Sequence, residues 1–369
     1  MQDSTITIIT SSAEAGTTET MPVAPEMKLI TTEELLKTNR HFSGDDIVCM
    51  TSENSLEALS GRLDPIRRKA LEMLKDKLLF REILREIYPR FDFRLVRAEE
   101  IASLTIERKS VIKPRRGIFG TAVKIVTPGA DMQRLSREID EEVQRNARVY
   151  AQSVLSAEEF ILEDFLEGEE YAVDLFYDSR GKPCIVNITH HPVPRDAAYI
   201  HMMYNTSKKA FDRIYPELQI FFTRLNDILK VTRFPMHAEV QVCGDEIVPV
   251  EINPMRFGGM GLGNLVYYAH GINPFLCFSR DHEPEWQKVW EGKEEKIYTY
   301  FIAYNGKNIH PDRSRPRNDK LKSHFTRVIR EQPFDHKKQL AFGIYFLEET
   351  EENLRELLKL DFNEFFEEA

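Results

Sequence analysis

One β-hairpin constrains this chain more than any other segment. Residues 237–242 read HAEVQV and residues 246–253 read EIVPVEIN, with Cys243-Gly244-Asp245 between them. Gly and Asp are turn-forming residues, and both flanking runs alternate in the way that strands do. We therefore predict an antiparallel hairpin with a three-residue turn, in which Val242 pairs with Glu246.

The polar side chains of this hairpin gather on one face, because alternate residues of a strand point the same way. The residues that share a face are His237, Glu239 and Gln241 on the first strand, and Ile247, Pro249, Glu251 and Asn253 on the second. In the predicted register Glu239 is opposite Pro249 and diagonal to Glu251, roughly 5–8 Å away. Two carboxylates and an amide oxygen suit Mg²⁺, which takes oxygen ligands. A solvated acidic face also fits the hairpin alone, so both interpretations stay open at this point.

The residues that close the hairpin add context. Glu251-Ile252-Asn253-Pro254 is followed by Met255-Arg256-Phe257-Gly258-Gly259. A Glu, apolar, Asn, Pro run followed by Arg and a Gly pair resembles the signature of the ATP-grasp superfamily. The resemblance implies two α+β lobes that grip ATP. It also implies that Glu239, Glu251 and Asn253 hold one or two Mg²⁺ ions, or Mn²⁺, against the phosphates.

Upstream segments resemble the same family in the expected order. Lys113 in VIKP closes a strand and would reach the phosphates, although an exposed strand lysine is the default interpretation in isolation. The turn over 115–120 carries Gly117 and Gly120, which permit close backbone approach to phosphate. Lys77 follows Asp76 at the start of a helix, as in similar Asp-Lys pairs that precede ATP-grasp domains.

A hinge strand completes the implied nucleotide site. Residues 161–166 read ILEDFL and are similar to the segment that contacts adenine. The resemblance assigns the adenine edge to Glu163 and Leu166, within the hinge Glu163, Asp164, Phe165 and Leu166. Glu170 then stands at the position that holds the ribose hydroxyls, although a plain turn carboxylate is the alternative.

The resemblance also implies a reaction. In this family a substrate carboxylate attacks the γ-phosphate, and an amine or another nucleophile displaces phosphate from the resulting acylphosphate. Arg256 would hold the acylphosphate or the later tetrahedral intermediate, since a guanidinium matches such oxyanions. Many members carry Arg directly after the Pro, whereas this chain has Met255 there. We therefore expect Arg256 to point differently from the usual residue.

Three further residues are candidates for the chemistry. His237 lies on the strand face of Glu239, where the family often has a cationic or hydrogen-bonding side chain; packing against a neighbour is an equal alternative. Arg195 and Lys208 fall in the segment 190–209, where the family places loops that face the substrate. They would bind the carboxylate or the γ-phosphate.

The overall layout is α+β with α/β parts. Strand-like runs at 5–10, 27–31 and 46–51 with a helix over 54–61 predict a small parallel α/β lobe. We expect this abbreviated N-terminal lobe over 1–75, an ATP-grasp domain over 76–280 with a lid at about 94–165, and an α+β extension over 281–369. Other expected elements are helices over about 131–147 and 216–230, an aperiodic loop over 191–207, strands at 297–304 and 340–348, and an acidic helix from about 350 to the end.

Composition narrows the functional classes. The net charge of −10 and the pI near 5.6 argue against a basic nucleic-acid-binding face. The four cysteines form no Cys-x-x-Cys pair, which fits a reducing cytoplasm. No apolar run approaches about 18 residues, so we expect no membrane span.

The sequence thus favours an ATP-dependent, carbon–nitrogen bond-forming ligase. Its partners would be a small carboxylate and a nucleophile, and a homodimer is compatible with this interpretation. A small-molecule kinase of the same fold and a non-catalytic ATP-binding regulator are the alternatives. The intact set Lys113, Glu239, Glu251 and Asn253 argues against the regulator.

Overall fold

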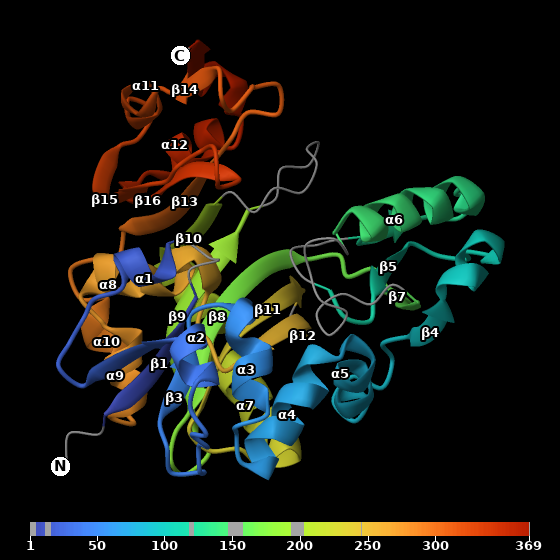
Figure 1. Cartoon of the computed structure of the whole chain (residues 1–369), viewed down its shortest axis with the longest axis horizontal. Helices are drawn as coiled ribbons and strands as arrows, with labels where there is room; N and C mark the ends of the chain where they lie inside the picture. The colour runs from blue at the N-terminus through green and yellow to red at the C-terminus, as the bar shows by residue number, and fades with distance from the viewer. Residues whose placement is uncertain are drawn as a thin grey trace.

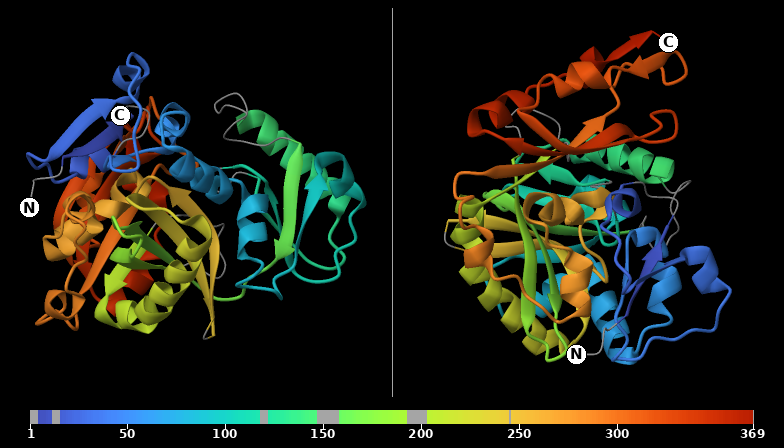
Figure 2. Two further views of the ribbon diagram at one scale, coloured as in Figure 1. Left: turned by 90° about the horizontal axis from the view of Figure 1, so that it is seen from below. Right: turned by 90° about the vertical axis from the view of Figure 1, so that its left-hand side faces the viewer.

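The computed structural model describes residues 5–11, 16–117, 122–146, 158–192, 203–244 and 246–368. A large sheet-based body fills the lower left and upper left of Figure 1, and a smaller lid with α6 extends to the right. The left view of Figure 2 shows the lid beside the body, joined to it at one side. Gly120 and Arg195 lie outside the described residues.

The N-terminal lobe is the small parallel sheet that the sequence predicts. Strands β1 (Ile6–Thr10), β2 (Met27–Thr31) and β3 (Val48–Met50) are parallel in the order β2-β1-β3. Along the chain, the short helix α1 (Thr17–Thr20) connects β1 to β2, and α2 (Thr32–Leu36) connects β2 to β3. The backbone N–H of Met50 donates to the carbonyl of Met255 at 2.8 Å, which ties the end of β3 to the hairpin.

Polar caps set the helices that follow, as the sequence indicates. Ser52 begins the turn η1 (Glu53–Ser55), which runs into α3 (Leu56–Ser60). Asp64 caps α4 (Pro65–Lys75), and Asp76 caps α5 (Lys77–Leu84), each through side-chain oxygens that accept first-turn N–H groups. Asp76 also ends α4, so Lys75 and Lys77 flank a single bend in the chain.

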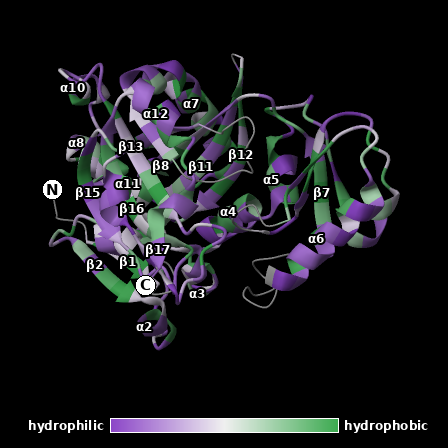
Figure 3. Ribbon diagram, turned by 90° about the horizontal axis from the view of Figure 1, so that it is seen from above, coloured by the Kyte–Doolittle hydropathy of each residue, from purple (hydrophilic) through white to green (hydrophobic). Residues whose placement is uncertain are grey.

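The lid is a four-stranded antiparallel sheet in the order β4-β7-β5-β6. Its strands are β4 (Phe93–Arg97), β5 (Ser110–Pro114), β6 (Lys124–Val126) and β7 (Glu159–Asp164), with the turn η2 (Ala98–Ser103). Helix α6 (Met132–Asn146) covers one face and buries Met132, Ile139 and Val143, as its spacing predicts. Figure 3 colours most of α6 hydrophilic, in keeping with a single apolar stripe.

The body is built on an eight-stranded antiparallel sheet in the order β12-β11-β8-β9-β10-β13-β16-β15. Three strands of the C-terminal region belong to it, so the sheet continues past residue 281. The strands are β8 (Glu169–Tyr177), β9 (Pro183–His191), β10 (Met203–Ser207), β11 (Phe234–Cys243), β12 (Glu246–Pro254), β13 (Ile297–Tyr304), β15 (Arg327–Pro333) and β16 (Ala341–Glu349).

Helices and short turns complete the body. The helix α7 (Lys208–Leu229) packs its apolar side on one face of the sheet, against Val173, Ala238 and Ile252. The remaining elements are η3 (Gly259–Asn264), α8 (Leu265–His270), α9 (Pro274–Ser279), α10 (Trp286–Val289), β14 (Ser314–Pro316), α11 (Asn318–Lys322), α12 (Glu351–Leu357), η4 (Phe362–Phe365) and β17 (Phe366–Glu368).

The structure corrects three of the expected elements. Helix α7 begins at residue 208 and not at 216, because the Ser207 side chain caps it and Pro216 is accommodated inside. The end of the expected loop 191–207 is the strand β10, whose edge is satisfied by pairing with β13. The acidic helix α12 stops at Leu357, and η4 and β17 follow it.

No helix in the described part of the chain has both the length and the apolar character needed to cross a bilayer.

Candidate functional site

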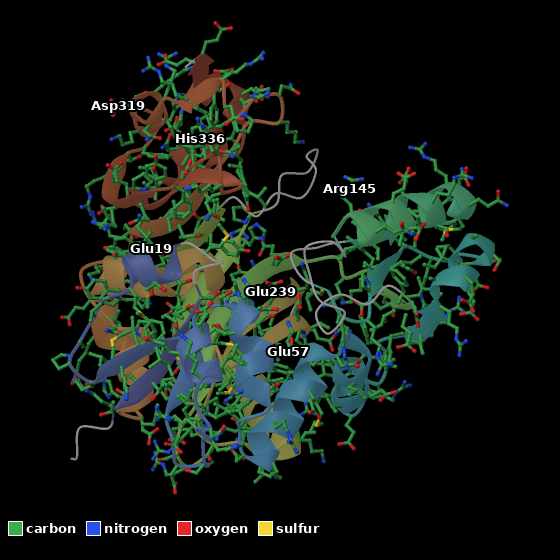
Figure 4. All side chains as sticks on the ribbon, in the orientation of Figure 1. Glu19, Glu57, Arg145, Glu239, Asp319 and His336 are labelled. Carbon is green, nitrogen blue, oxygen red and sulfur yellow. The ribbon has the colours of Figure 1, made fainter. Side chains whose placement is uncertain are left out.

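The carboxylates of the hairpin face each other directly. Cys243 pairs with Glu246, so the turn holds two residues and not three, and the predicted register is wrong. A β-bulge leaves Val250 unpaired and shifts the register, which brings Glu239 opposite Glu251 and not opposite Pro249. Directly opposed side chains are closer than diagonal ones, at about 5 Å between Cβ atoms. Figure 4 labels Glu239 near the centre of the molecule, between the body and the lid.

This proximity is visible in the electrostatics of the pair. Burial raises the pKa of Glu239 to about 7, and the charges of Glu251 and Glu170 add to the rise. Burial also disfavours the charged form of Glu251, but Lys77 and Lys75 hold its pKa below the ordinary value. The side chains remain 21% and 23% exposed. Two carboxylates that repel each other at a partly open position suit a hard cation, so the donor set fits Mg²⁺.

Two lysines from the bend between α4 and α5 contact the same oxygen set. Lys77 Nζ lies 3.1 Å from Glu251 Oε1 and 3.2 Å from the carbonyl of Gly117. Lys75 Nζ lies 3.1 Å from Asn253 Oδ1. The structure thus places Lys77 beside the hairpin, while its role in nucleotide binding stays a prediction, and it adds Lys75, which the sequence reasoning missed. The pairing of two lysines around one helix cap could have indicated it.

Arg256 also stays at the hairpin despite the displaced motif. Met255 adopts a left-handed backbone with φ of 62° and is fully buried, with backbone bonds to Pro235 and Met50. Arg256 Nη2 lies 2.8 Å from Glu53 Oε1, and Nη1 donates to the carbonyl of Phe257 at 3.0 Å. Its charge acts to lower the pKa of Glu239. The positive charge of Arg256 therefore acts on the carboxylate pair of the hairpin.

His237 is held by a buried acid that sequence reasoning missed. His237 Nδ1 lies 2.8 Å from Asp174 Oδ1, and the same oxygen accepts the N–H of Gly258 at 2.8 Å. The other ring nitrogen, Nε2, lies 4.0 Å from Glu239 Oε1. Asp174 on β8 thus orients the imidazole so that Nε2 faces the carboxylate pair. Strand parity on β8 could have placed Asp174 there only if the partner strand had been known.

Lys113 belongs to a buried charge network between lid and body. Its Nζ lies 2.7 Å from Glu163 Oε1, and Arg81 Nε and Nη2 hold the same carboxylate at 2.8 and 3.0 Å. Arg81 on α5 also donates to the carbonyl of Pro249 on β12 at 2.6 Å. Burial lowers the pKa of Lys113 to about 8. Burial opposes ionisation of Glu163, but Arg81 and Lys113 outweigh it and hold the pKa near 2.

The hinge residues Glu163, Asp164 and Phe165 contact other residues of the protein. The carboxylate of Glu163 is engaged by two cations, so its role as an adenine contact stays a prediction. Asp164 accepts the N–H of Asp92 at 2.8 Å and pairs with Arg108, while the ring of Phe165 lies under Lys109. The assignments of Asp164, Phe165 and Leu166 to nucleotide binding likewise stay predictions.

Glu170 faces the same side of the sheet as the carboxylate pair. Its two oxygens lie 2.9 Å from His191 Nδ1 and 3.1 Å from Gln241 Nε2. The His191 ring stacks on Tyr204, with centroids 4.4 Å apart. Glu170 is therefore fixed on one face with Glu239, and its charge contributes to the raised pKa of that residue.

One candidate lies apart from this cluster. Lys208 begins α7, which packs on the opposite face of the sheet, and its ammonium pairs with Asp212. The structure therefore does not bring Lys208 to the carboxylates, because β10 ends there and the chain turns onto the other face. Arg195 and Gly120 fall outside the described residues.

Known proteins share the fold described above. The ATP-grasp domain pattern matches residues 106–264, which run from the lid to η3. The L-amino acid ligase of Bacillus licheniformis has a similar structure, with a TM-score of 0.65 at 14% identity, over 100% of this chain and 99% of that one.

Two further structures cover nearly the whole chain. The N5-carboxyaminoimidazole synthase of Aspergillus clavatus, solved with ADP, gives a TM-score of 0.60 at 11% identity over 99% of both chains. The biotin carboxylase of Campylobacter jejuni gives 0.59 at 10% identity, over 98% of this chain and 92% of that one. At these identities the structural likeness shows the fold. No curated protein sequence matches the chain.

Proposed function

We propose, from the premise that the chain belongs to the ATP-grasp superfamily, that it is an ATP-dependent ligase. It would activate a small-molecule carboxylate for attack by an amine or another nucleophile. The observation that carries this proposal is the opposed pair Glu239 and Glu251, with Asn253 on the same strand and cations on several sides. The three solved structures described above are named as a ligase, a synthase and a carboxylase, which supports the class.

The chain's own residues divide the work of holding ATP and Mg²⁺. Glu239, Glu251 and Asn253 would hold the metal, which neutralises charge as the γ-phosphate is transferred. Lys77 and Lys75 already contact these oxygens and would turn to the phosphates when a cation takes their place. Lys113 would bind phosphate from the lid side, with Gly117 in the adjoining turn. The hinge and Glu170 would hold adenosine.

The remaining polar residues would act on the substrate oxygens. Arg256 has a planar guanidinium whose charge acts on Glu239, and this group suits an acylphosphate or a tetrahedral intermediate. His237, oriented by Asp174, presents Nε2 to the same space and would donate a hydrogen bond to a phosphate oxygen when that nitrogen is protonated. These groups position and neutralise charge, which is most of what phosphoryl transfer requires.

Products distinguish this ligase from the kinase alternative. We expect the wild-type protein to release free phosphate from MgATP only when a suitable carboxylate and a nucleophile are both present. A screen of amino acids and other small carboxylates, each with and without an amine, would measure phosphate and ADP. ADP formed with a phosphorylated alcohol and no free phosphate would overturn the ligase proposal in favour of a kinase.

The pH dependence of nucleotide binding is expected to report on Lys113. Its pKa is lowered to about 8 by burial, so the ammonium is present below that pH and lost as the pH rises through it. The contribution of Lys113 to MgATP affinity should therefore be complete below pH 8, and the affinity should fall by up to about tenfold per pH unit above it. Titration calorimetry across this pH range would measure the change.

A matched variant tests the assignment of that pH effect. Lys113→Arg keeps the positive charge throughout, because a guanidinium does not lose its proton in this range. The fall in MgATP affinity above pH 8 should disappear in this variant. An unchanged pH profile in Lys113→Arg would show that another group titrates.

A further inference from the structure

Glu53 from the N-terminal lobe reaches into the candidate site. Its Oε1 lies 2.8 Å from Arg256 Nη2, and its Oε2 lies 2.8 Å from Lys75 Nζ. Lys75 in turn contacts Asn253 Oδ1 at 3.1 Å. One carboxylate therefore contacts two cations of the site, and through Lys75 it is linked to one of the proposed metal ligands.

The position of Glu53 is fixed by its local structure. It lies three residues after the end of β3 and is the first residue of η1, which Ser52 caps by accepting the N–H of Asn54 at 3.2 Å. The side chain is 18% exposed. Burial opposes its ionisation, yet the charges of Lys75 and Arg256 hold its pKa well below the ordinary value. Glu53 is thus a fixed negative charge on a short, capped turn.

The backbone turns sharply just before Arg256, because Met255 adopts a left-handed conformation with φ of 62°. Glu53 gives the Arg256 guanidinium a carboxylate acceptor at 2.8 Å, in addition to the carbonyl of the adjacent Phe257. A long side chain without such a partner samples many rotamers, which costs free energy each time it must be ordered.

We propose that Glu53 is a positioning residue, which aims Arg256 and Lys75 at the transferred phosphate and so couples the N-terminal lobe to the ATP site. The proposal rests on the function proposed above. Glu53 acts through these two cations and is not assigned a contact with substrate. It adds to the site a carboxylate that orients neighbouring cations without serving as a metal ligand.

The charges around Glu53 predict that its substitution changes MgATP affinity and kcat in different ways. Glu53→Gln keeps the shape of the side chain but removes one negative charge beside two cations. The site then becomes more positive, so affinity for the anionic MgATP should stay level or tighten. Arg256 and Lys75 each lose a charged partner that orients them, so kcat should fall by about 10- to 100-fold, as is typical when a supporting partner is removed.

The experiment compares four proteins: wild type, Glu53→Gln, Glu53→Asp and Glu57→Gln. Glu57 is exposed on the following helix. Glu57→Gln removes the same charge at a position away from the site, so this variant should behave as wild type. Calorimetry would measure the Kd for MgATP, and phosphate release with the carboxylate and amine found in the screen would give kcat. Glu53→Asp keeps the charge one methylene further back and should recover part of kcat.

The outcomes are distinct. A fall in kcat with level or tighter MgATP binding in Glu53→Gln, together with partial recovery in Glu53→Asp, supports the proposal. Unchanged kcat overturns it, and so does a parallel loss of kcat and MgATP affinity, which would indicate a structural role. If wild type binds MgATP but no carboxylate triggers phosphate release, the proposed ligase function fails instead. A crystal structure of Glu53→Gln then decides whether Arg256 and Lys75 have moved.

Discussion

Replacing Glu251 by glutamine is expected to abolish ATP turnover while leaving the fold intact. The amide keeps the shape of the side chain but is a much weaker ligand for a hard cation and cannot neutralise Lys77 at 3.1 Å. We expect kcat to fall by about 10³-fold or more, the scale on which loss of one preorganised electrostatic group acts. Steady-state phosphate release at saturating MgATP would measure the effect.

Stability should move little, or rise, in the same variant. Glu251 and Glu239 repel each other across the hairpin, and removal of one charge relieves that repulsion. Glu246→Gln is the matched control, since Glu246 lies on the same strand and is exposed at its far end. Control and wild type should turn over alike. Full activity in Glu251→Gln would refute the metal-ligand assignment.

Replacing Arg81 by methionine is expected to have the largest effect on stability. Glu163 and Arg81 are 4% and 2% exposed, and Arg81 holds both carboxylate oxygens as well as the carbonyl of Pro249. Without Arg81 the buried carboxylate keeps only Lys113, and two acceptors lose their donor. Breaking such a buried pair typically costs about 3–5 kcal/mol. Urea unfolding followed by circular dichroism would measure the loss.

Two companions make this prediction specific. Arg68→Met removes an arginine from the exposed side of α4 and should change the free energy of unfolding by less than about 0.5 kcal/mol. The double variant Arg81→Met with Glu163→Gln removes the buried carboxylate as well, although Lys113 then loses its anionic partner, so it should recover only part of the loss. If Arg81→Met were as stable as Arg68→Met, the buried network would not join lid and body in the way its geometry indicates.

Short-range features of this fold could be read from the sequence. The caps at Asp64 and Asp76 appear where polar side chains precede apolar spacing, because the first turn of any helix leaves N–H groups that such side chains satisfy. The small parallel lobe and the hairpin strands follow from alternation and turn residues. Strand parity also gave the residues that share a face within each hairpin strand, since parity inside one strand does not depend on its partner.

Longer-range features could not be read in this way. The bulge at Val250 depends on how β12 packs, and it decided that Glu239 faces Glu251 and not Pro249. The strands of the C-terminal region extend the central sheet because β13 pairs with β10, a contact between segments about 95 residues apart. Lys208 was expected near the substrate, but α7 carries it to the opposite face.

By itself the sequence determined which oxygen-bearing side chains the hairpin carries and which of them share a face within each strand. These are properties of residues close together in the chain, where strand periodicity and turn chemistry act. Only the tertiary structure decided what surrounds those side chains. Glu53, Lys75, Arg81 and Asp174 come from four separate elements, and they meet the site because buried charges must find partners of opposite sign or hydrogen-bonding groups.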